Sequence, residues 1–79
     1  MRRLGSVLHI SSSSRNLILK AEPGAKIGEA VLDSRGKKIG TVFDIFGPVV
    51  KPYASVKPKI KDPKRLIGED LYFKKGKKQ

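Results

Sequence analysis

Apolar and polar residues alternate in short runs along this chain, and glycine, proline or serine interrupts each run. Alternation with a period of two is typical of β-strands that bury one face. No run follows a helical period for long enough to make a full helix, although Asp62-Pro63 can open a single helical turn. The pattern predicts six short strands, over residues 4–10, 15–21, 30–33, 38–46, 53–56 and 70–73.

Two pairs of these strands are expected to form hairpins. The run Ser11–Ser14 predicts a polar loop between the first two strands, because serine hydroxyls compete for backbone hydrogen bonds. Gly47-Pro48 separates the fourth strand from the fifth, because proline cannot donate to a strand ladder. We expect this second hairpin, residues 40–53, to carry both part of the core and the working surface.

The fourth predicted strand is apolar on both faces. Alternation places Ile39, Thr41, Phe43 and Ile45 on the barrel face and Gly40, Val42, Asp44 and Phe46 on the other. Two apolar faces suit a closed barrel better than an open sheet, so the chain is expected to be an all-β, six-stranded barrel. Gly40 inside the strand indicates a bulge or the close approach of another backbone.

The length of 79 residues allows one domain, which we place at residues 1–73, followed by a basic and disordered tail at 74–79. The chain has no cysteine, which excludes disulfides and thiolate metal sites. No apolar run approaches the length of a membrane span, and no signal-peptide region follows the basic N-terminus. We therefore expect a soluble cytoplasmic protein with no membrane partner.

The formal net charge of +11 predicts attraction to polyanions, most simply RNA or an RNA–protein complex. A basic surface can also serve solubility alone. A loop rich in lysine supplies the candidates for contacts with RNA phosphates, which are Lys57, Lys59, Lys61, Lys64 and Arg65. No aromatic residue is interleaved with them, so this loop is not expected to stack on bases.

Catalytic chemistry has little support in the sequence. His9 is the single histidine, and a structural or surface role is expected for it. Its closeness in sequence to Ser11–Ser14 does not make a nucleophile–base pair. The acids are scattered, no metal-ligand spacing occurs, and no glycine-rich phosphate loop precedes a helix. We expect no enzyme activity, no metal and no cofactor.

Two residues of the central hairpin leave alternatives open. A buried Asp44 would need hydrogen bonds, because an unpaired buried carboxylate is costly. It either anchors the turn by accepting N–H groups near Gly47 or contacts a partner. Phe46 next to Gly47-Pro48 is either part of an interface hot spot or a cap on the end of the barrel.

Residues 40–49, Gly-Thr-Val-Phe-Asp-Ile-Phe-Gly-Pro-Val, resemble the signature of the archaeal Gar-type subunit of H/ACA ribonucleoproteins, the glycine/arginine-rich protein family. Pro52-Tyr53 and Val56-Lys57-Pro58 extend the match. Residues 3–9 and 67–72 are similar to the start and end of that family, so the resemblance covers about residues 2–75. The glycine/arginine-rich flanks of the eukaryotic members are missing, which removes any RNA-binding role assigned to those flanks.

The resemblance implies a translation-factor or reductase type of barrel and a non-catalytic role in guide-RNA-directed pseudouridine synthesis in rRNA. It implies binding to the dyskerin-type pseudouridine synthase, with weak or indirect contact to the guide RNA. The subunit would influence the thumb loop of the synthase, and so substrate loading and product release. The implied partner contacts are Phe46, Gly47, Pro48, Val49, Pro52 and Tyr53, and Gly40 and Asp44 would shape the hairpin.

Other readings of the same residues remain open. A ribosome-maturation adaptor of the PRC-barrel type also has a small barrel with a G-x-V-x-D strand, and it would bind a ribosomal protein. A free-standing RNA-binding barrel such as an OB-fold would need several exposed aromatic side chains on adjacent strands. Of the five aromatic residues here, we expect at least Phe43 and Phe73 in the core.

Overall fold

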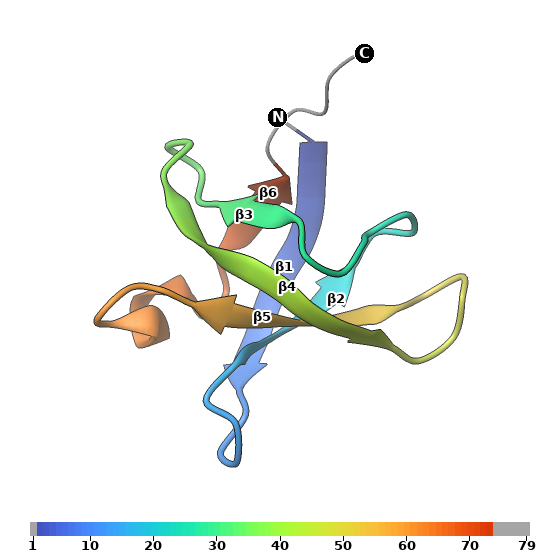
Figure 1. The fold of residues 1–79 in the computed structure, drawn as a ribbon, viewed down its shortest axis with the longest axis horizontal. Coiled ribbons are helices and arrows are strands. Elements are labelled where there is room, and N and C mark those ends of the chain that lie inside the picture. Colours follow the sequence, from blue (N-terminus) through green and yellow to red (C-terminus); the bar gives the residue numbers. More distant parts are fainter. Residues whose placement is uncertain (1, 74–79) are drawn as a thin grey trace.

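The computed structural model describes residues 2–73, and these form a closed antiparallel barrel of six strands (Figure 1). The predicted all-β, six-stranded barrel is confirmed. The expected tail, residues 74–79, lies outside the described residues. In chain order the elements are β1 (Arg2–Ile10), β2 (Leu17–Ala21), β3 (Ala30–Leu32), β4 (Lys38–Phe46), β5 (Tyr53–Pro58), the 3-10 helix η1 (Pro63–Leu66) and β6 (Asp70–Phe73).

The strands follow one another around the barrel in the order β1-β2-β5-β4-β3-β6, with β6 pairing back onto β1. Both predicted hairpins, β1–β2 and β4–β5, are present as antiparallel pairs. Closure leaves no strand of this barrel without a neighbour on either side, which removes the exposed edges that favour aggregation. η1 provides the single helical turn that Asp62-Pro63 predicted.

All six strands and η1 contribute side chains to one apolar core. Fully buried leucines lie on β1 (Leu4), β2 (Leu17 and Leu19), η1 (Leu66) and β6 (Leu71). Burying one such side chain stabilises a fold by about 1.5–3 kcal/mol before the entropy of ordering is subtracted. η1 therefore helps to close the barrel through Leu66, and the basic residues beside it stay on the surface.

Gly40 lies where β4 passes close to β5. A Cβ atom at this position would collide with the carbonyl oxygen of Lys57 and lie 3.1 Å from the Cα of Pro58. The expectation that Gly40 marks a close backbone approach is confirmed. The absence of a side chain here allows the backbones of β4 and β5 to approach closely where Gly40 pairs with Pro58.

A bulge in β4 changes the faces of that strand from those that alternation predicts. Val42 pairs with Val56 and Asp44 pairs with Ser55, so Phe43 has no partner on β5. Ile39 likewise has no partner on β3, since Val31 pairs with Gly40 and Leu32 pairs with Lys38. Across this earlier irregularity the buried positions change from Ile39 to Val42, so Val42 is 2% exposed whereas Phe43 is 59% exposed. The prediction that Phe43 lies in the core is wrong for this reason, while that for Phe73 is confirmed.

Candidate functional site

Two surfaces of different chemistry lie at opposite ends of the long axis of the molecule (Figure 1). The loop between β4 and β5 lies at one end, and the loop between β5 and η1 lies at the other. Their separation follows from the antiparallel pairing of β4 with β5, since a nine-residue strand spans about 30 Å. We call residues 43–53 the apolar hairpin, and the surface around η1 and the turn before β4 the basic end.

A stacked aromatic pair forms the base of the apolar hairpin. Phe46 and Tyr53 are paired across β4 and β5, and their ring centroids lie 5.8 Å apart at an interplanar angle of 22°. Gly47 follows with φ of +90°, and a Cβ there would approach Cδ2 of Tyr53 to 3.1 Å. Glycine at this position therefore permits both the left-handed backbone and the close contact with the ring.

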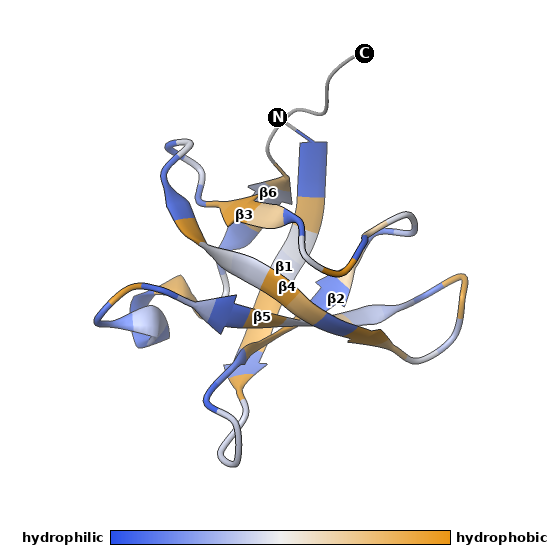
Figure 2. Ribbon diagram, viewed as in Figure 1, coloured by the Kyte–Doolittle hydropathy of each residue, from blue (hydrophilic) through white to orange (hydrophobic). Residues whose placement is uncertain are grey.

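The tip of the apolar hairpin is a turn with two valines at its corners. The backbone N–H of Lys51 donates to the carbonyl oxygen of Pro48 at 3.2 Å, which closes the turn around Val49 and Val50. Val49 is 89% exposed and Val50 is 75% exposed, whereas turn corners favour glycine, asparagine, aspartate and serine. Figure 2 colours the ribbon at this tip as hydrophobic. Exposed apolar side chains that cluster in this way are typical of a protein contact.

The residues expected to contact a partner do not all face solvent. Gly47 and Pro48 are exposed with Phe46 and Val49, and Tyr53 is half-buried. Pro52 is buried, and its carbonyl oxygen accepts the backbone N–H of Ala21 at 2.9 Å. Pro52 therefore ties the loop to the barrel from inside and does not offer its side chain to a partner.

Three exposed apolar side chains outside the predicted set extend this surface. Val50 completes the turn, and Phe43 projects from the bulge in β4. Ile27, 64% exposed, lies in a segment that runs beside β4, since the N–H of the next residue, Gly28, donates to the carbonyl of Val42 at 2.8 Å. Gly40 was the one sequence signal for an irregularity in this strand, and nothing local in the sequence placed Ile27 beside it.

Asp44 lies in the middle of this surface and is exposed. Its carboxylate accepts the backbone N–H of Ile45 at 2.8 Å, and no contact with backbone near Gly47 is present within residues 2–73. The expected anchoring of the turn by Asp44 is therefore not observed. Its carboxylate is a polar group among apolar neighbours, available to a cation on a partner.

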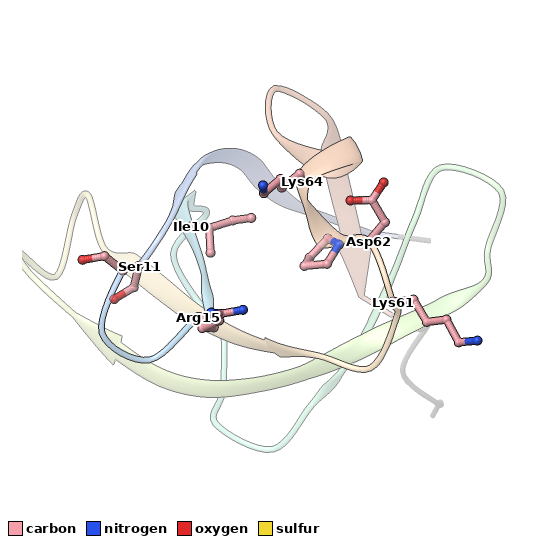
Figure 3. A pocket seen from close by; sticks show the side chains of 8 residues that line it. Ile10, Ser11, Arg15, Lys61, Asp62 and Lys64 are labelled. Carbon is pink, nitrogen blue, oxygen red and sulfur yellow. The ribbon is translucent and has the colours of Figure 1, made fainter.

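Two adjoining depressions form the basic end. The first, the serine-loop pocket, is a half-open cavity of about 590 Å³ between the serine loop and η1 (Figure 3). Its polar lining comes from Ser11, Ser12, Arg15, Lys61, Asp62 and Lys64. The second, the lysine groove, is about 460 Å³, and its charged lining comes from Lys37, Lys38, Lys59, Lys61, Asp62 and Arg65. Lys61 and Asp62 line both, so the two depressions are neighbours on the surface.

Four of the five residues predicted to contact phosphates line these depressions. Lys57 is exposed on β5 but lines neither of them. The backbone N–H of Lys59 donates to the carbonyl of Ile39 at 2.7 Å, which holds the loop after β5 beside the start of β4. That contact brings Lys37 and Lys38 into the lysine groove. The structure therefore adds cations that are remote in sequence from the predicted loop.

Asp33 fixes the turn that carries two of these lysines. Its Oδ1 accepts the backbone N–H groups of Arg35 at 2.9 Å and of Lys37 at 3.0 Å. Burial raises the pKa of this carboxyl, but the N–H groups of Lys37 and Arg35 and the charges of Arg65 and Arg35 outweigh it. The pKa of Asp33 therefore lies below its ordinary value, and the ionised form stabilises the turn.

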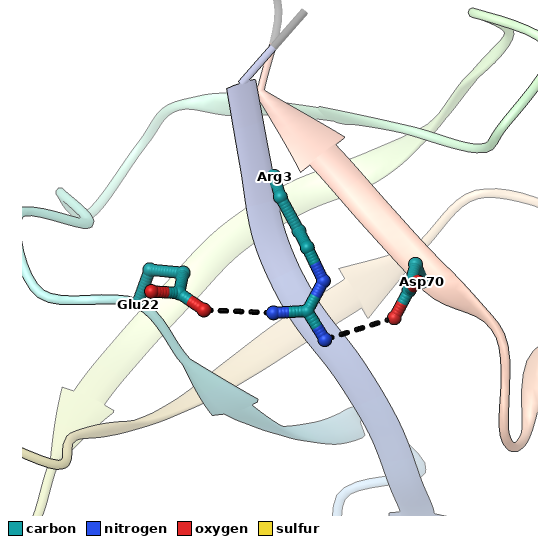
Figure 4. Close-up of polar contacts among 3 residues, drawn as sticks. All are labelled: Arg3, Glu22 and Asp70. Carbon is teal, nitrogen blue, oxygen red and sulfur yellow. Dashed lines mark hydrogen bonds and ion pairs between the residues drawn. The ribbon is translucent and has the colours of Figure 1, made fainter.

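Arg3, in contrast to the cations of the basic end, is paired with two acidic side chains. Arg3 on β1 donates to Glu22 at 2.7 Å and to Asp70 on β6 at 3.0 Å (Figure 4). The hydrogen bond and charge of Asp70, followed by the charge of Glu22, raise the pKa of Arg3. Two acids thus neutralise this arginine, whereas Asp62 is the one acid that lines the two depressions of the basic end.

Other chemistry is sparse in the part of the chain that the structure describes. Within residues 2–73, no group of three or more histidine, aspartate or glutamate side chains could hold a metal ion. His9 is exposed on β1, opposite Ile18 of β2. No helix in this range is long and apolar enough to cross a membrane.

Comparison with known proteins shows relatives among archaea. An uncharacterized protein of Methanothermobacter thermautotrophicus is 40% identical over 76 residues, which cover 91% of this chain and 82% of that protein. An uncharacterized protein of Methanocaldococcus jannaschii is 50% identical over 46 residues, which cover 58% of this chain and 56% of that protein. No protein-family model matches the chain.

Proposed function

The chain belongs to the same protein family as the Methanothermobacter thermautotrophicus protein, and we propose that it is a non-catalytic docking subunit of an RNA–protein complex. The observation that carries this proposal is the turn with Val49 and Val50 exposed at its corners, beside the stacked Phe46 and Tyr53. A monomeric barrel gains no stability from two valines in water at a turn. An apolar partner surface would bury them and gain their transfer free energy.

The shape of the hairpin suits docking as a rigid body. The stacked rings, the hydrogen bond from Lys51 to Pro48 and the hydrogen bond from Ala21 to Pro52 each restrict the loop. A loop that is already ordered loses little conformational entropy when it binds. The apolar hairpin is therefore a preformed contact surface and not a segment that folds on its partner.

The partner we propose is a dyskerin-type pseudouridine synthase of the H/ACA complex. The support is the resemblance over residues 40–49, the most specific part of the match. The last four of these residues, 46–49, are exposed at the start of the loop. Residues needed only for the barrel would be expected in the core, whereas Phe46 is 44% exposed. The subunit would act in archaeal rRNA modification without contributing a catalytic group.

Docking of a rigid hairpin can influence a mobile loop of the synthase by favouring one of its positions. Such an effect requires different contact free energies in the two loop positions, since equal binding to both shifts no equilibrium. A coupling of about 1–3 kcal/mol is typical and would change loop populations five- to 150-fold. This is the mechanism we propose for assisting substrate loading and product release.

A binding experiment tests this function. The purified chain is immobilised and presented with an archaeal dyskerin-type synthase without RNA, and in parallel with guide RNA alone. We expect capture of the synthase at 0.5 M salt, because an apolar contact is little screened. Capture of guide RNA at this salt concentration, with no synthase bound, would contradict the proposed partner.

A further inference from the structure

We propose that the basic end is a second binding surface, which holds the phosphates of a single RNA strand. One phosphate would lie in the serine-loop pocket between Arg15 and Lys64, and following phosphates would lie in the lysine groove. This surface has no part in docking through the apolar hairpin, which lies at the other end of the molecule (Figure 1).

The first observation is the geometry of charge in the serine-loop pocket. Arg15 enters it from the serine loop and Lys64 from η1, so two cations from distant parts of the chain face one cavity (Figure 3). Ser11 and Ser12 also line the cavity, and the hydroxyl of Ser11 is turned toward its own loop, where it lies 3.2 Å from Oγ of Ser13. The carboxylate of Asp62 points away from Arg15 in Figure 3. Paired cations are groups that bind phosphate oxygens.

The second observation is the left-handed backbone conformation of Arg15. It is independent of the argument from charge. Arg15 has φ of +64°, the one residue other than glycine with positive φ within residues 2–73. A left-handed conformation costs a side chain such as arginine about 1–2 kcal/mol, and glycine or asparagine would fit with less strain. Strain of this kind is often found at binding sites, where a particular side chain is needed.

The serine loop holds Arg15 firmly in this position. The N–H of Arg15 donates to the carbonyl of Ser11 at 2.9 Å, and the N–H of Ser11 donates to the carbonyl of Asn16 at 2.9 Å. The buried amide of Asn16 donates to Oγ of Ser55 on β5 at 2.9 Å, which ties the loop to the barrel. The guanidinium is therefore presented from a fixed loop, so binding a phosphate orders little new structure.

The third observation is that the two depressions are neighbours, since Lys61 and Asp62 line both. A strand that leaves the serine-loop pocket would reach the lysine groove by passing these two residues. In the groove it would meet Lys37, Lys38 and Lys59, which come from two segments of the chain. Arg65 lies between this groove and Asp33, whose charge it partly offsets, so we do not count it among the main contacts.

The chemistry of this end favours RNA over an acidic peptide. A tight peptide complex needs exposed apolar anchors as well as charge. The apolar side chains beside these depressions, Ile10 and Ile60, are partly buried and packed against the core. The most exposed large apolar side chains, Val49 and Val50, lie on the apolar hairpin. A polyphosphate strand needs only cations and hydrogen-bond donors.

The test is the salt dependence of binding to a fluorescent ten-nucleotide oligouridine, followed by anisotropy with the full chain. The site variant is Arg15→Asn, Lys61→Gln and Lys64→Gln. Asparagine tolerates the left-handed backbone, so the loop is retained. The control variant is Lys20→Gln, Lys26→Gln and Lys51→Gln, which removes the same charge from exposed lysines that line neither depression.

Each neutralised phosphate of a single strand contributes about −0.7 to the slope of log K against log salt concentration. We expect the site variant to bind about 100-fold more weakly than the wild type at 0.1 M salt, with a slope shallower by about two. The control variant should change affinity by less than about fivefold, the effect of one phosphate contact. An equal loss of RNA affinity in the site variant and the control variant would show a general effect of charge and overturn the proposed site.

Competition experiments distinguish an RNA strand from a free nucleotide or an acidic peptide as the ligand of the basic end. Binding of the site variant to the synthase separates this proposal from the docking function. Uridine 5′-monophosphate at millimolar concentration should not displace the oligonucleotide, because a single nucleotide reaches only one subsite; full displacement would assign the pocket to free nucleotides. A poly-glutamate peptide that competes as well as RNA would also contradict the proposal. The site variant should still bind the synthase. Loss of RNA binding alone therefore concerns the basic end, whereas loss of synthase binding concerns the apolar hairpin.

Discussion

Replacing both turn valines with serine, Val49→Ser and Val50→Ser, removes the apolar tip of the hairpin. With exposures of 89% and 75%, the two side chains offer most of their area to a partner. Burying a valine is worth about 1.5–3 kcal/mol, and an interface buries only part of that area. We expect a loss of about 2–3 kcal/mol in binding free energy, which is about 30- to 150-fold in Kd.

Titration calorimetry with the synthase measures this change, and thermal unfolding of the free chain provides the folding control. Serine is common at turn corners, so the stability of the free barrel should change by less than about 0.5 kcal/mol. Ile67→Ser is the matched control, since Ile67 is 47% exposed but lies after η1, away from the hairpin. A Kd changed less than twofold, or weakened equally by Ile67→Ser, would refute the assignment of the docking surface.

Three further predictions concern the barrel itself. Gly40→Ala should destabilise it by about 1–3 kcal/mol, since the new Cβ meets backbone of β5, and an unchanged melting temperature would contradict this close approach. Arg15→Asn should raise stability by about 0.5–1 kcal/mol through relief of left-handed strain, and an unchanged or lower denaturant midpoint would contradict this. Because the pKa of Asp33 is lowered in the fold, its ionised form adds stability at neutral pH that is lost as pH falls through the folded pKa. The stability difference between wild type and Asp33→Asn should therefore shrink on acidification below about pH 4, and a constant difference would argue against it.

Local pattern was enough to predict the class of fold and most strand positions. β4 and β6 have the predicted bounds, because each begins and ends at polar or glycine-rich segments. β1 starts earlier than predicted, at Arg2, because pairing with β6 extends it. Such extension depends on a partner strand that is distant in sequence, so local alternation could not show it.

The candidate site was harder to predict, since bulges and loop contacts decide it. Two register irregularities in β4, at Ile39 against β3 and at Phe43 against β5, put Phe43 on the surface and not in the expected core. Pro52 is buried because the hairpin loop folds back onto β2, a contact made through backbone atoms. Arg15 and Lys64 are remote in sequence, and only closure of the barrel brings them to one pocket.

The most direct test of the central claim is an NMR titration of the ¹⁵N-labelled chain with unlabelled dyskerin-type synthase. Our account predicts loss of amide signals confined to residues 43–53 and the neighbouring Ile27, with little change around Arg15 and Lys61. Loss of signals at the basic end with an unaffected hairpin, or no change at a saturating concentration of synthase, would contradict the claim that the apolar hairpin is the docking surface.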